Sequence, residues 1–229
     1  GWDEHAAVLH YTRKDVAAPD PGAVLLIDAG ATHLGYASDI TRTYVTDRAP
    51  ELFVDLLDGM ERLQRELVEA VAPGVQYVDL HRQAHRGVAE LLAETGLLRI
   101  DAEDAVERGI SGAFLPHGLG HHLGLQVHDV GGRQAGPTGG KVDPPEAFPH
   151  LRTTRPLETG HVVTIEPGLY FVPMLLDPLR DGADADALDW SAVDALVPYG
   201  GIRIEDDVLV TVEGFEDLSR PHCPGHQST

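Results

Sequence analysis

The chain has 229 residues, of which 42% are hydrophobic and 24% are charged, so it can bury one sizeable core or two small ones. Its formal net charge of −20 argues against nucleic acid or an anionic membrane surface as a partner, because both repel an acidic protein. A single cysteine, Cys223, together with the lack of a membrane-spanning apolar run and of a visible signal peptide, favours a cytoplasmic location.

The N-terminal part of the sequence predicts a β-hairpin. Residues 24–27 form an apolar run that is typical of a buried strand and that ends at Asp28. A second strand, from about residue 36 to residue 45, follows a short glycine-containing connection. Such a hairpin can bring Asp28 and Asp39 to one place.

Two helices follow, and strands return after them. Apolar residues recur at helical spacing over residues 52–67, and a second helix is expected to start near Tyr77 and to end near Gly96. This order of strands, helices and strands predicts an α+β fold rather than alternating βαβ units. The later segments are two predicted surface loops at 131–149 and 181–189 and two predicted strands at 162–165 and 201–210.

Five segments place a carboxylate or a histidine inside or beside apolar sequence. A carboxylate in a core strand is costly unless it is paired or bound to a metal ion. One such residue alone is most simply a hydrogen-bonded structural group, but five together indicate a shared site. The segments are LIDAG (26–30), ASDIT (37–41), HGLGH (117–121), TIEPG (164–168) and IRIED (202–206).

The alternation of side chains along the last two strands indicates where their acidic residues point. Arg203 and Glu205 share one face of the strand at 201–210, and Thr164 and Glu166 share one face of the strand before it. Several carboxylates with one or two histidines suit Mn²⁺, Co²⁺, Fe²⁺ or Zn²⁺, and they offer more ligands than one ion uses. Two ions about 3.5–4 Å apart would need bridging carboxylates.

These motifs resemble the pita-bread metallopeptidase family, which includes prolidase, aminopeptidase P and methionine aminopeptidase. Within the family they look most like bacterial prolidase (Xaa-Pro dipeptidase) and organophosphorus acid anhydrolase. The resemblance implies a curved, mostly antiparallel sheet with outer helices. It also implies a catalytic domain over residues 1–218 that lacks its N-terminal part, and we expect a flexible tail at 219–229. The matching stretches are EHAAVLHYT, LLIDAG, GYASDITRTY, YVDLH, FLPHGLGHHLGLQVHDVGG, LRTTR, VVTIEPGLYF and GGIRIEDDVLVT.

The resemblance implies a ligand set for two divalent metal ions per chain. Asp28 would chelate one ion, and Asp39 and Glu205 would bridge both. His121 and Glu166 would complete the second ion, and Glu166 would also handle the proton of a hydroxide that bridges the pair. We expect Mn²⁺, with Co²⁺, Zn²⁺ and Fe²⁺ as alternatives.

The resemblance also implies a substrate site. His10, His117 and His128 match family histidines that line this site, and with Glu166 they are the expected catalytic residues. His128 would hydrogen-bond the substrate carbonyl and the developing oxyanion. Arg152 lies in LRTTR, where prolidases hold the dipeptide carboxylate, and an arginine can bind a carboxylate through two parallel hydrogen bonds.

Tyr77 and Arg203 complete the expected substrate-binding group. Tyr77 matches a tyrosine near the metal site, and Arg203 matches an arginine beside the bridging glutamate. The implied function is hydrolysis of the Xaa-Pro bond of dipeptides by attack of the metal-bridging hydroxide. The implied partners are a small dipeptide with a C-terminal proline and, in the full-length form, a second copy of the chain in a homodimer.

Two alternative functions stay open. Aminopeptidase P or an organophosphate-hydrolysing relative would use the same ligands, although the LRTTR and LLDPLR segments favour prolidase. A non-catalytic pita-bread module that binds proteins belongs to another class, but such modules usually lose ligands, and here all five positions are filled. Because EHAAVLHYT lies almost at residue 1, we expect this chain alone to be poorly stable and to hydrolyse Xaa-Pro slowly or not at all.

Overall fold

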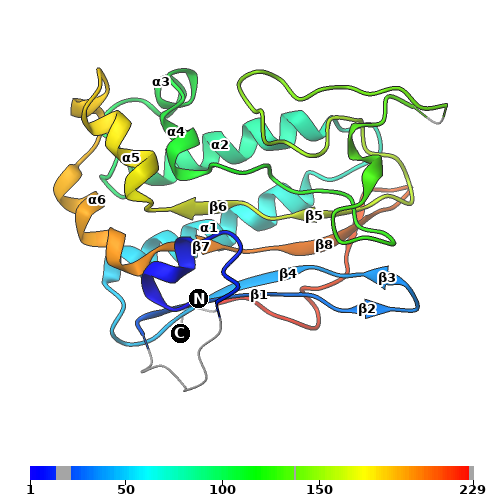
Figure 1. Ribbon diagram of the computed structural model, residues 1–229, viewed down its shortest axis with the longest axis horizontal. Coiled ribbons are helices and arrows are strands. Elements are labelled where there is room, and N and C mark those ends of the chain that lie inside the picture. Colours follow the sequence, from blue (N-terminus) through cyan, green and yellow to red (C-terminus); the bar gives the residue numbers. More distant parts are fainter. Residues whose placement is uncertain (14–21, 137, 227–229) are drawn as a thin grey trace.

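Short antiparallel strands run side by side, and the two long helices lie along them (Figure 1). The computed structural model describes residues 1–13, 22–136 and 138–226. The strands are β1 (Val24–Ala29), β2 (Thr32–His33), β3 (Tyr36–Ala37), β4 (Ile40–Val45), β5 (Val162–Ile165), β6 (Gly168–Tyr170), β7 (Gly201–Arg203), β8 (Asp206–Val210) and β9 (Phe215–Asp217). The helices are α1 (Glu51–Glu69), α2 (Tyr77–Glu94), α3 (Ala102–Glu107), α4 (Ile110–Phe114), α5 (Pro173–Arg180) and α6 (Trp190–Leu196). Short 3₁₀ helices are η1 (Asp3–Ala7), η2 (Val130–Arg133), η3 (Ala185–Ala187) and η4 (Val197–Tyr199).

The long helices α1 and α2 confirm the prediction made from apolar spacing. Phe53, Leu56 and Met60 of α1 are fully buried, as the periodic pattern requires. The two helices pack closely, because a Cβ atom placed on Gly59 of α1 would lie 2.3 Å from the side chain of Leu91 in α2. The connection between them therefore folds α2 back along α1.

The predicted hairpin is present, but its second strand is divided. β1 pairs antiparallel with β4, and β2 pairs with β3. Between β3 and β4 the chain leaves the strand at Ser38 and Asp39, where the Ser38 carbonyl comes so close to Gly30 that a Cβ atom there would lie 2.0 Å away. The Asp39 N–H donates to the Asp207 carboxylate at 3.2 Å. The break therefore ties Asp39 to the C-terminal strands.

The strand predicted at 201–210 is also divided, into β7 and β8. β7 pairs with β6 and β8 pairs with β5, and the break lies opposite Glu166 and Pro167. Pro167 has no N–H with which to continue the ladder. The Glu205 N–H instead donates to the Thr41 carbonyl at 3.0 Å. Glu205 therefore lies where the hairpin meets the C-terminal strands.

The ladders of the described residues join into one curved surface. They are β1–β4, β2–β3, β5–β8–β9 and β6–β7, and the bridge between Thr41 and Glu205 links the first of them to the strands β7 and β8. The core lies between this surface and the helices, and its largest fully buried side chains include Tyr77, Phe53 and Phe114. Among the helices of the described part of the chain, none is long and apolar enough to cross a membrane.

The predicted loops are largely confirmed, with short helical turns inside them. The loop at 131–149 contains the end of η2, and most of its residues are exposed or half-buried. The second loop, at 181–189, contains η3, and its Ala187 and Leu188 are buried. One alanine and one leucine in an acidic segment were too weak a signal to predict this contact with the core.

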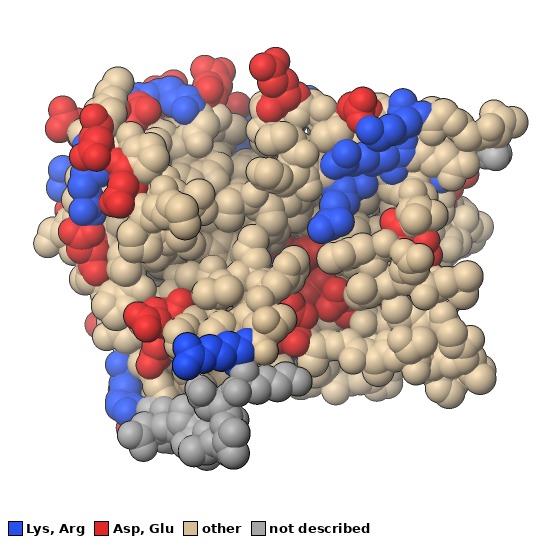
Figure 2. Space-filling model, in the orientation of Figure 1, with Lys and Arg blue, Asp and Glu red and all other residues tan. Residues whose placement is uncertain are grey.

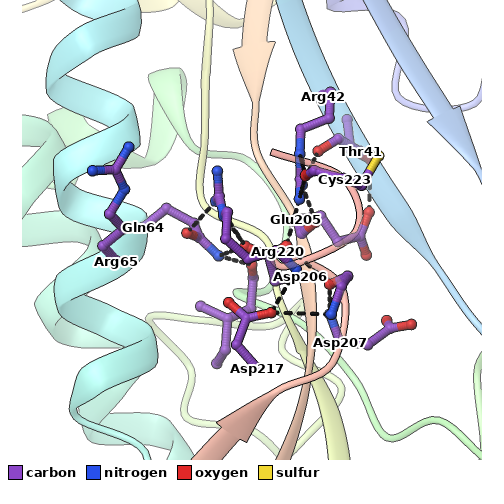
Figure 3. A network of polar contacts seen from close by, with 12 residues as sticks. Thr41, Arg42, Gln64, Arg65, Glu205, Asp206, Asp207, Asp217, Arg220 and Cys223 are labelled. Carbon is purple, nitrogen blue, oxygen red and sulfur yellow. Dashed lines mark hydrogen bonds and ion pairs between the residues drawn. The ribbon is translucent and has the colours of Figure 1, made fainter. Parts of the chain in front are cut away.

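A network of polar contacts connects the C-terminal residues to α1 and β8 (Figure 3). The Arg220 guanidinium donates to Asp206 Oδ2 at 2.9 Å and to Glu61 Oε2 at 2.8 Å. Arg42 Nε donates to the Cys223 carbonyl at 2.8 Å, and Arg42 also pairs with Asp206 at 2.6 Å. The side chain of Asp206 is fully buried, and a buried acid requires such partners.

This network corrects the prediction of a flexible tail for residues 219–226. The Ser219 hydroxyl donates to Asp206 at 2.9 Å, and the His226 N–H donates to Glu61 at 2.8 Å. The polar composition of the segment suggested disorder, but the segment supplies the partners of buried acids. Residues 227–229 lie outside the described part of the chain, and the domain boundary at residue 218 stays a prediction.

Candidate metal centre

The five predicted ligand residues come from distant segments and converge on one point. Asp28 lies near the end of β1, and Asp39 lies at the break before β4. Glu166 directly follows β5, and Glu205 lies between β7 and β8. Ligand atoms of Asp28, Asp39 and Glu205 lie within 4.8 Å of one another. Ligand atoms of His121, Glu166 and Glu205 form a second such group, so Glu205 belongs to both.

His121 is oriented with its Nε2 towards the carboxylates. Its Nδ1 donates to the His122 carbonyl at 3.1 Å, so Nδ1 carries a hydrogen. Its Nε2 lies 3.6 Å from Asp39 Oδ2 and 3.5 Å from Glu166 Oε1. The His121 N–H donates to Thr164 Oγ1 at 3.0 Å, which attaches this segment to β5. The arrangement leaves Nε2 directed at the point where an ion would sit.

Glu205 carries the clearest sign that this site suits a cation. The Thr41 hydroxyl donates to its Oε2 at 2.6 Å, but its buried Oε1 has no hydrogen-bond partner in the described structure. An unpaired buried carboxylate oxygen is costly. A divalent ion at this oxygen would remove that cost, and the surrounding oxygen and imidazole ligands fit such an ion.

The electrostatics of the cluster lead to the same conclusion. Burial raises the pKa of Asp28 and of Glu166, and it raises the pKa of Glu205 well above its ordinary value, with nearby carboxylates adding to each rise. Burial also acts upwards on Asp39, but the hydrogen bond and charge of His121 outweigh it and lower the pKa of Asp39. Several crowded carboxylates therefore repel one another, and divalent cations would relieve this repulsion.

Arg203 positions neighbouring groups through its own hydrogen bonds. Its Nη2 donates to Asp28 Oδ2 at 2.5 Å, and its Nη1 donates to the Tyr170 hydroxyl at 3.1 Å. That hydroxyl lies 2.9 Å from His117 Nε2, while His117 Nδ1 lies 2.8 Å from the Gly118 carbonyl. The tautomer with hydrogen on Nδ1 satisfies both contacts, so Tyr170 donates to His117. Arg203 thus orients Asp28 and, through Tyr170, His117.

A cavity of about 510 Å³ opens over the carboxylates. Its lining includes the predicted substrate residues His10, His117, His128 and Arg152. Figure 2 shows acidic side chains in this hollow and basic side chains along its rim. The His128 ring packs against that of His121 with centroids 4.4 Å apart. Burial, then the charges of His121 and Arg152, lower the pKa of His128 to about 4, so His128 is neutral at pH 7.

Tyr77 does not line this cavity, which corrects its predicted place among the substrate-binding residues. Its side chain is fully buried, and its hydroxyl donates to the Thr164 carbonyl at 2.6 Å. The Thr164 N–H in turn donates to the His121 carbonyl at 2.9 Å. Tyr77 is therefore close to the metal centre, as predicted, but it acts on the centre by supporting the backbone that holds His121.

Several polar residues of the site escaped sequence reasoning. Thr41 binds Glu205, Tyr170 links Arg203 to His117, and Asp207 accepts the Asp39 N–H. Burial raises the pKa of Asp207 to about 7, and the Asp39 charge contributes to the rise. Each of these residues lies inside a motif used for the prediction, but only tertiary contacts give it a role.

Comparison with known proteins identifies the family. The sequence model of metallopeptidase family M24 matches residues 1–212. The chain belongs to this family. This membership confirms the resemblance to pita-bread metallopeptidases that rested on the motifs, and it agrees with a site built from carboxylates and a histidine.

Similar proteins include two named Xaa-Pro dipeptidases. That of Stenotrophomonas maltophilia is 49% identical over 219 residues, covering 96% of this chain and 49% of the relative. That of Marinobacter nauticus is 52% identical over 221 residues, covering 96% of this chain and 50% of the relative. The chain therefore spans about half the length of the curated relatives it matches.

The fold is similar to that of a solved aminopeptidase. Aminopeptidase PepP of Pseudomonas aeruginosa superposes with a TM-score of 0.74 at 30% sequence identity, covering 98% of this chain and 44% of that chain. The predicted pita-bread fold, with its mixture of helices and antiparallel strands, is thereby confirmed.

Proposed function

We propose that this chain forms the metal-binding part of a dinuclear metallopeptidase that hydrolyses the Xaa-Pro bond of dipeptides. The observation that carries the proposal is the convergence of four carboxylates and His121 beneath a cavity that also contains Arg152. The names of the similar dipeptidases support the same reaction. These similar dipeptidases are about twice as long as this chain. The proposal therefore concerns the whole protein, to which this chain contributes the metal centre.

The five ligand residues would hold two divalent ions. Asp39 and Glu205 would be shared between the ions, while Asp28 would serve one ion and His121 and Glu166 the other. When bound, such ions polarise a carbonyl group and lower the pKa of a water molecule towards neutrality. Mn²⁺ suits a ligand set in which carboxylate oxygens dominate. The choice of Mn²⁺ over Co²⁺, Zn²⁺ or Fe²⁺, the cytoplasmic location and the homodimer stay predictions from the sequence.

Side chains on the cavity wall would perform the proton transfers and orient the substrate. Glu166, oriented by the Thr164 hydroxyl at 3.2 Å, would accept a proton and pass it to the leaving nitrogen of proline. Neutral His128 would donate a hydrogen bond to the carbonyl oxygen as negative charge develops on it. His10 and His117 would complete the wall around the scissile bond, and Tyr170 would keep His117 in one tautomer.

Arg152 would bind the C-terminal carboxylate of the dipeptide. It lines the cavity beside His128, and its charge lowers the pKa of His128, so the two side chains face the same space. A guanidinium can form two parallel hydrogen bonds with a carboxylate. A substrate held in this way would place its peptide carbonyl between the metal centre and His128.

Aminopeptidase P activity is the second candidate, because the solved neighbour of this fold is an aminopeptidase. The same metal centre would serve both reactions, so the choice depends on whether the cavity requires a free carboxylate next to the proline. Comparing Ala-Pro with Ala-Pro-Ala as substrates separates the two functions. A non-catalytic binding module would hydrolyse neither substrate. The convergence of all five ligand side chains argues against such a module.

Removal of either shared carboxylate tests the metal centre. Asp39→Asn or Glu205→Gln should lower metal content below two ions per chain and reduce Xaa-Pro hydrolysis more than about 100-fold, because a shared ligand serves both ions. Elemental analysis after mild dialysis and a dipeptide assay measure the two effects. The control is Glu94→Gln on the exposed end of α2, which should change neither. A folded, Mn²⁺-supplemented wild-type protein without stoichiometric metal would contradict the proposal.

A further inference from the structure

Arg133 is a second arginine in the cavity, and it was not among the predicted site residues. It lines both the cavity over the metal centre and an adjoining cavity of about 580 Å³. The two cavities also share His121, His128 and Arg152, so they form one continuous space beside the metal centre. Arg133 therefore faces the same region as the arginine proposed to bind the substrate.

Two closely packed backbone segments hold the arginines side by side. Arg133 Nη2 donates to the Leu151 carbonyl at 2.8 Å, one residue before Arg152. The Thr154 N–H donates to the Gly132 carbonyl at 2.8 Å. A Cβ atom on Gly132 would lie 2.5 Å from the Arg152 carbonyl, so only glycine permits this approach. The short turn η2 and the LRTTR segment thus form one wall that carries both guanidinium groups.

Neither guanidinium is neutralised by a carboxylate within ion-pairing distance in the described part of the chain. This is notable in a protein with 37 acidic and 17 basic residues, where a basic side chain has many acids to choose from. Asp129 lines the adjoining cavity with Arg133 but forms no ion pair with it, and Asp143, which is fully exposed, pairs with Lys141 at 2.5 Å. Lys141 first, and Arg133 to a smaller degree, lower the pKa of Asp143. Two arginine charges therefore remain available to a ligand.

We propose that Arg133 is a specificity-determining residue that binds the C-terminal carboxylate of the substrate together with Arg152. This inference rests on the proposed function. A carboxylate has two oxygens that accept several hydrogen bonds, so it can be shared by two guanidinium groups. One nitrogen of Arg133 is used by the Leu151 carbonyl, and its other donors remain for the ligand. Two cations at one subsite favour a free carboxylate over an uncharged amide more strongly than one cation does.

Two substitutions separate the charge of Arg133 from its structural bond to Leu151. Arg133→Lys keeps the charge, whereas Arg133→Gln keeps a hydrogen-bond donor and loses the charge. In the Mn²⁺-loaded full-length protein, Arg133→Gln should raise KM for Ala-Pro by about 10-fold or more, as expected for loss of a charge-assisted hydrogen bond. Arg133→Lys should retain most of the affinity. Hydrolysis of Ala-Pro amide should change little in either variant, and Arg152→Ala should show the same selectivity.

The controls distinguish this inference from the proposed function. Arg82→Gln, on the exposed face of α2, should leave both substrates unaffected. Binding of proline and of prolinamide, measured by calorimetry, gives the same comparison without turnover. Equal losses on dipeptide and amide, full activity of Arg133→Gln, or no preference of the wild type for proline over prolinamide would overturn the role of Arg133. Failure of the full-length wild-type protein to bind metal or to hydrolyse any Xaa-Pro substrate would instead contradict the proposed function.

Discussion

Replacement of Arg220 by glutamine tests whether the C-terminal segment stabilises the fold. The Arg220 side chain is 18% exposed and contacts two acids that are almost fully buried. It lies 2.7 Å from Asp206 and 2.8 Å from Glu61, and its Nη2 also donates to Gln64 Oε1 at 2.7 Å. Arg220→Gln removes the charge that these two carboxylates share.

The expected loss of stability follows from the partners that remain. Breaking a buried ion pair from one side costs about 3–5 kcal/mol. Asp206 would keep its 2.6 Å pair with Arg42, and Glu61 would keep the backbone N–H of His226. We therefore expect a loss near the lower end, about 3 kcal/mol, for Arg220→Gln. Because the urea dependence of stability is about 2–3 kcal/mol per molar for a domain of this kind, the unfolding midpoint should fall by about 1 M.

Equilibrium urea unfolding followed by circular dichroism measures this change. The matched control is Arg82→Gln, which removes an arginine from an exposed pair with Asp79 and should cost less than about 1 kcal/mol. Arg220→Lys should fall between the two, since one ammonium group cannot reach all the partners of the guanidinium. Identical midpoints for Arg220→Gln and Arg82→Gln would refute the claim that residues 219–226 are part of the folded core.

Two further predictions concern buried polar groups. Tyr77→Phe leaves the Thr164 carbonyl without its 2.6 Å donor and should lower the free energy of unfolding, measured in urea, by about 1–3 kcal/mol. The same variant should bind metal more weakly in a titration. Unchanged stability and unchanged metal affinity would contradict the positioning role of Tyr77. Burial lowers the pKa of His81 to about 2 and that of His85 to about 4, from an ordinary value of 6.5. As pH falls below 6.5, the unfolded chain therefore binds more protons than the folded protein does, and the stability of the fold declines towards pH 4. Each neutral histidine contributes about 1.4 kcal/mol per pH unit to this slope, so His81→Leu should flatten it by about one proton, and an unchanged slope would show that His81 does not remain neutral.

The long helices and the ligand residues were predictable because their signals are local and repeated. In α1, apolar residues such as Leu56, Met60 and Leu63 recur every three or four positions, and burial follows directly from that spacing. Asp28 and Glu166 stand out because each follows an apolar strand whose interior an acid would not normally enter. The sequence therefore identifies which residues are unusual.

The details that make the site work depend on contacts between distant segments, which spacing does not contain. The break between β7 and β8 arises because Pro167 lies opposite it, and residues 219–226 are held in place because they bind the buried Asp206 and Glu61. Arg133 gains a place in the cavity only because Gly132 packs against the LRTTR segment. Its local sequence is typical of an exposed loop, and nothing there predicts a binding residue.

The separation of the ligands along the chain determines when metal selection takes place during biosynthesis. The hydrogen bond from Thr41 to Glu205 spans 164 residues, so the pocket for the ions closes only after the last of these strands has been made. Before that point the nascent chain carries Asp28, Asp39, His121 and Glu166 but lacks Glu205, the carboxylate that belongs to both groups of ligand atoms. The complete set of five ligands therefore exists only once Glu205 has been made, and the ions present around the chain from that stage onwards would decide which ion the site acquires.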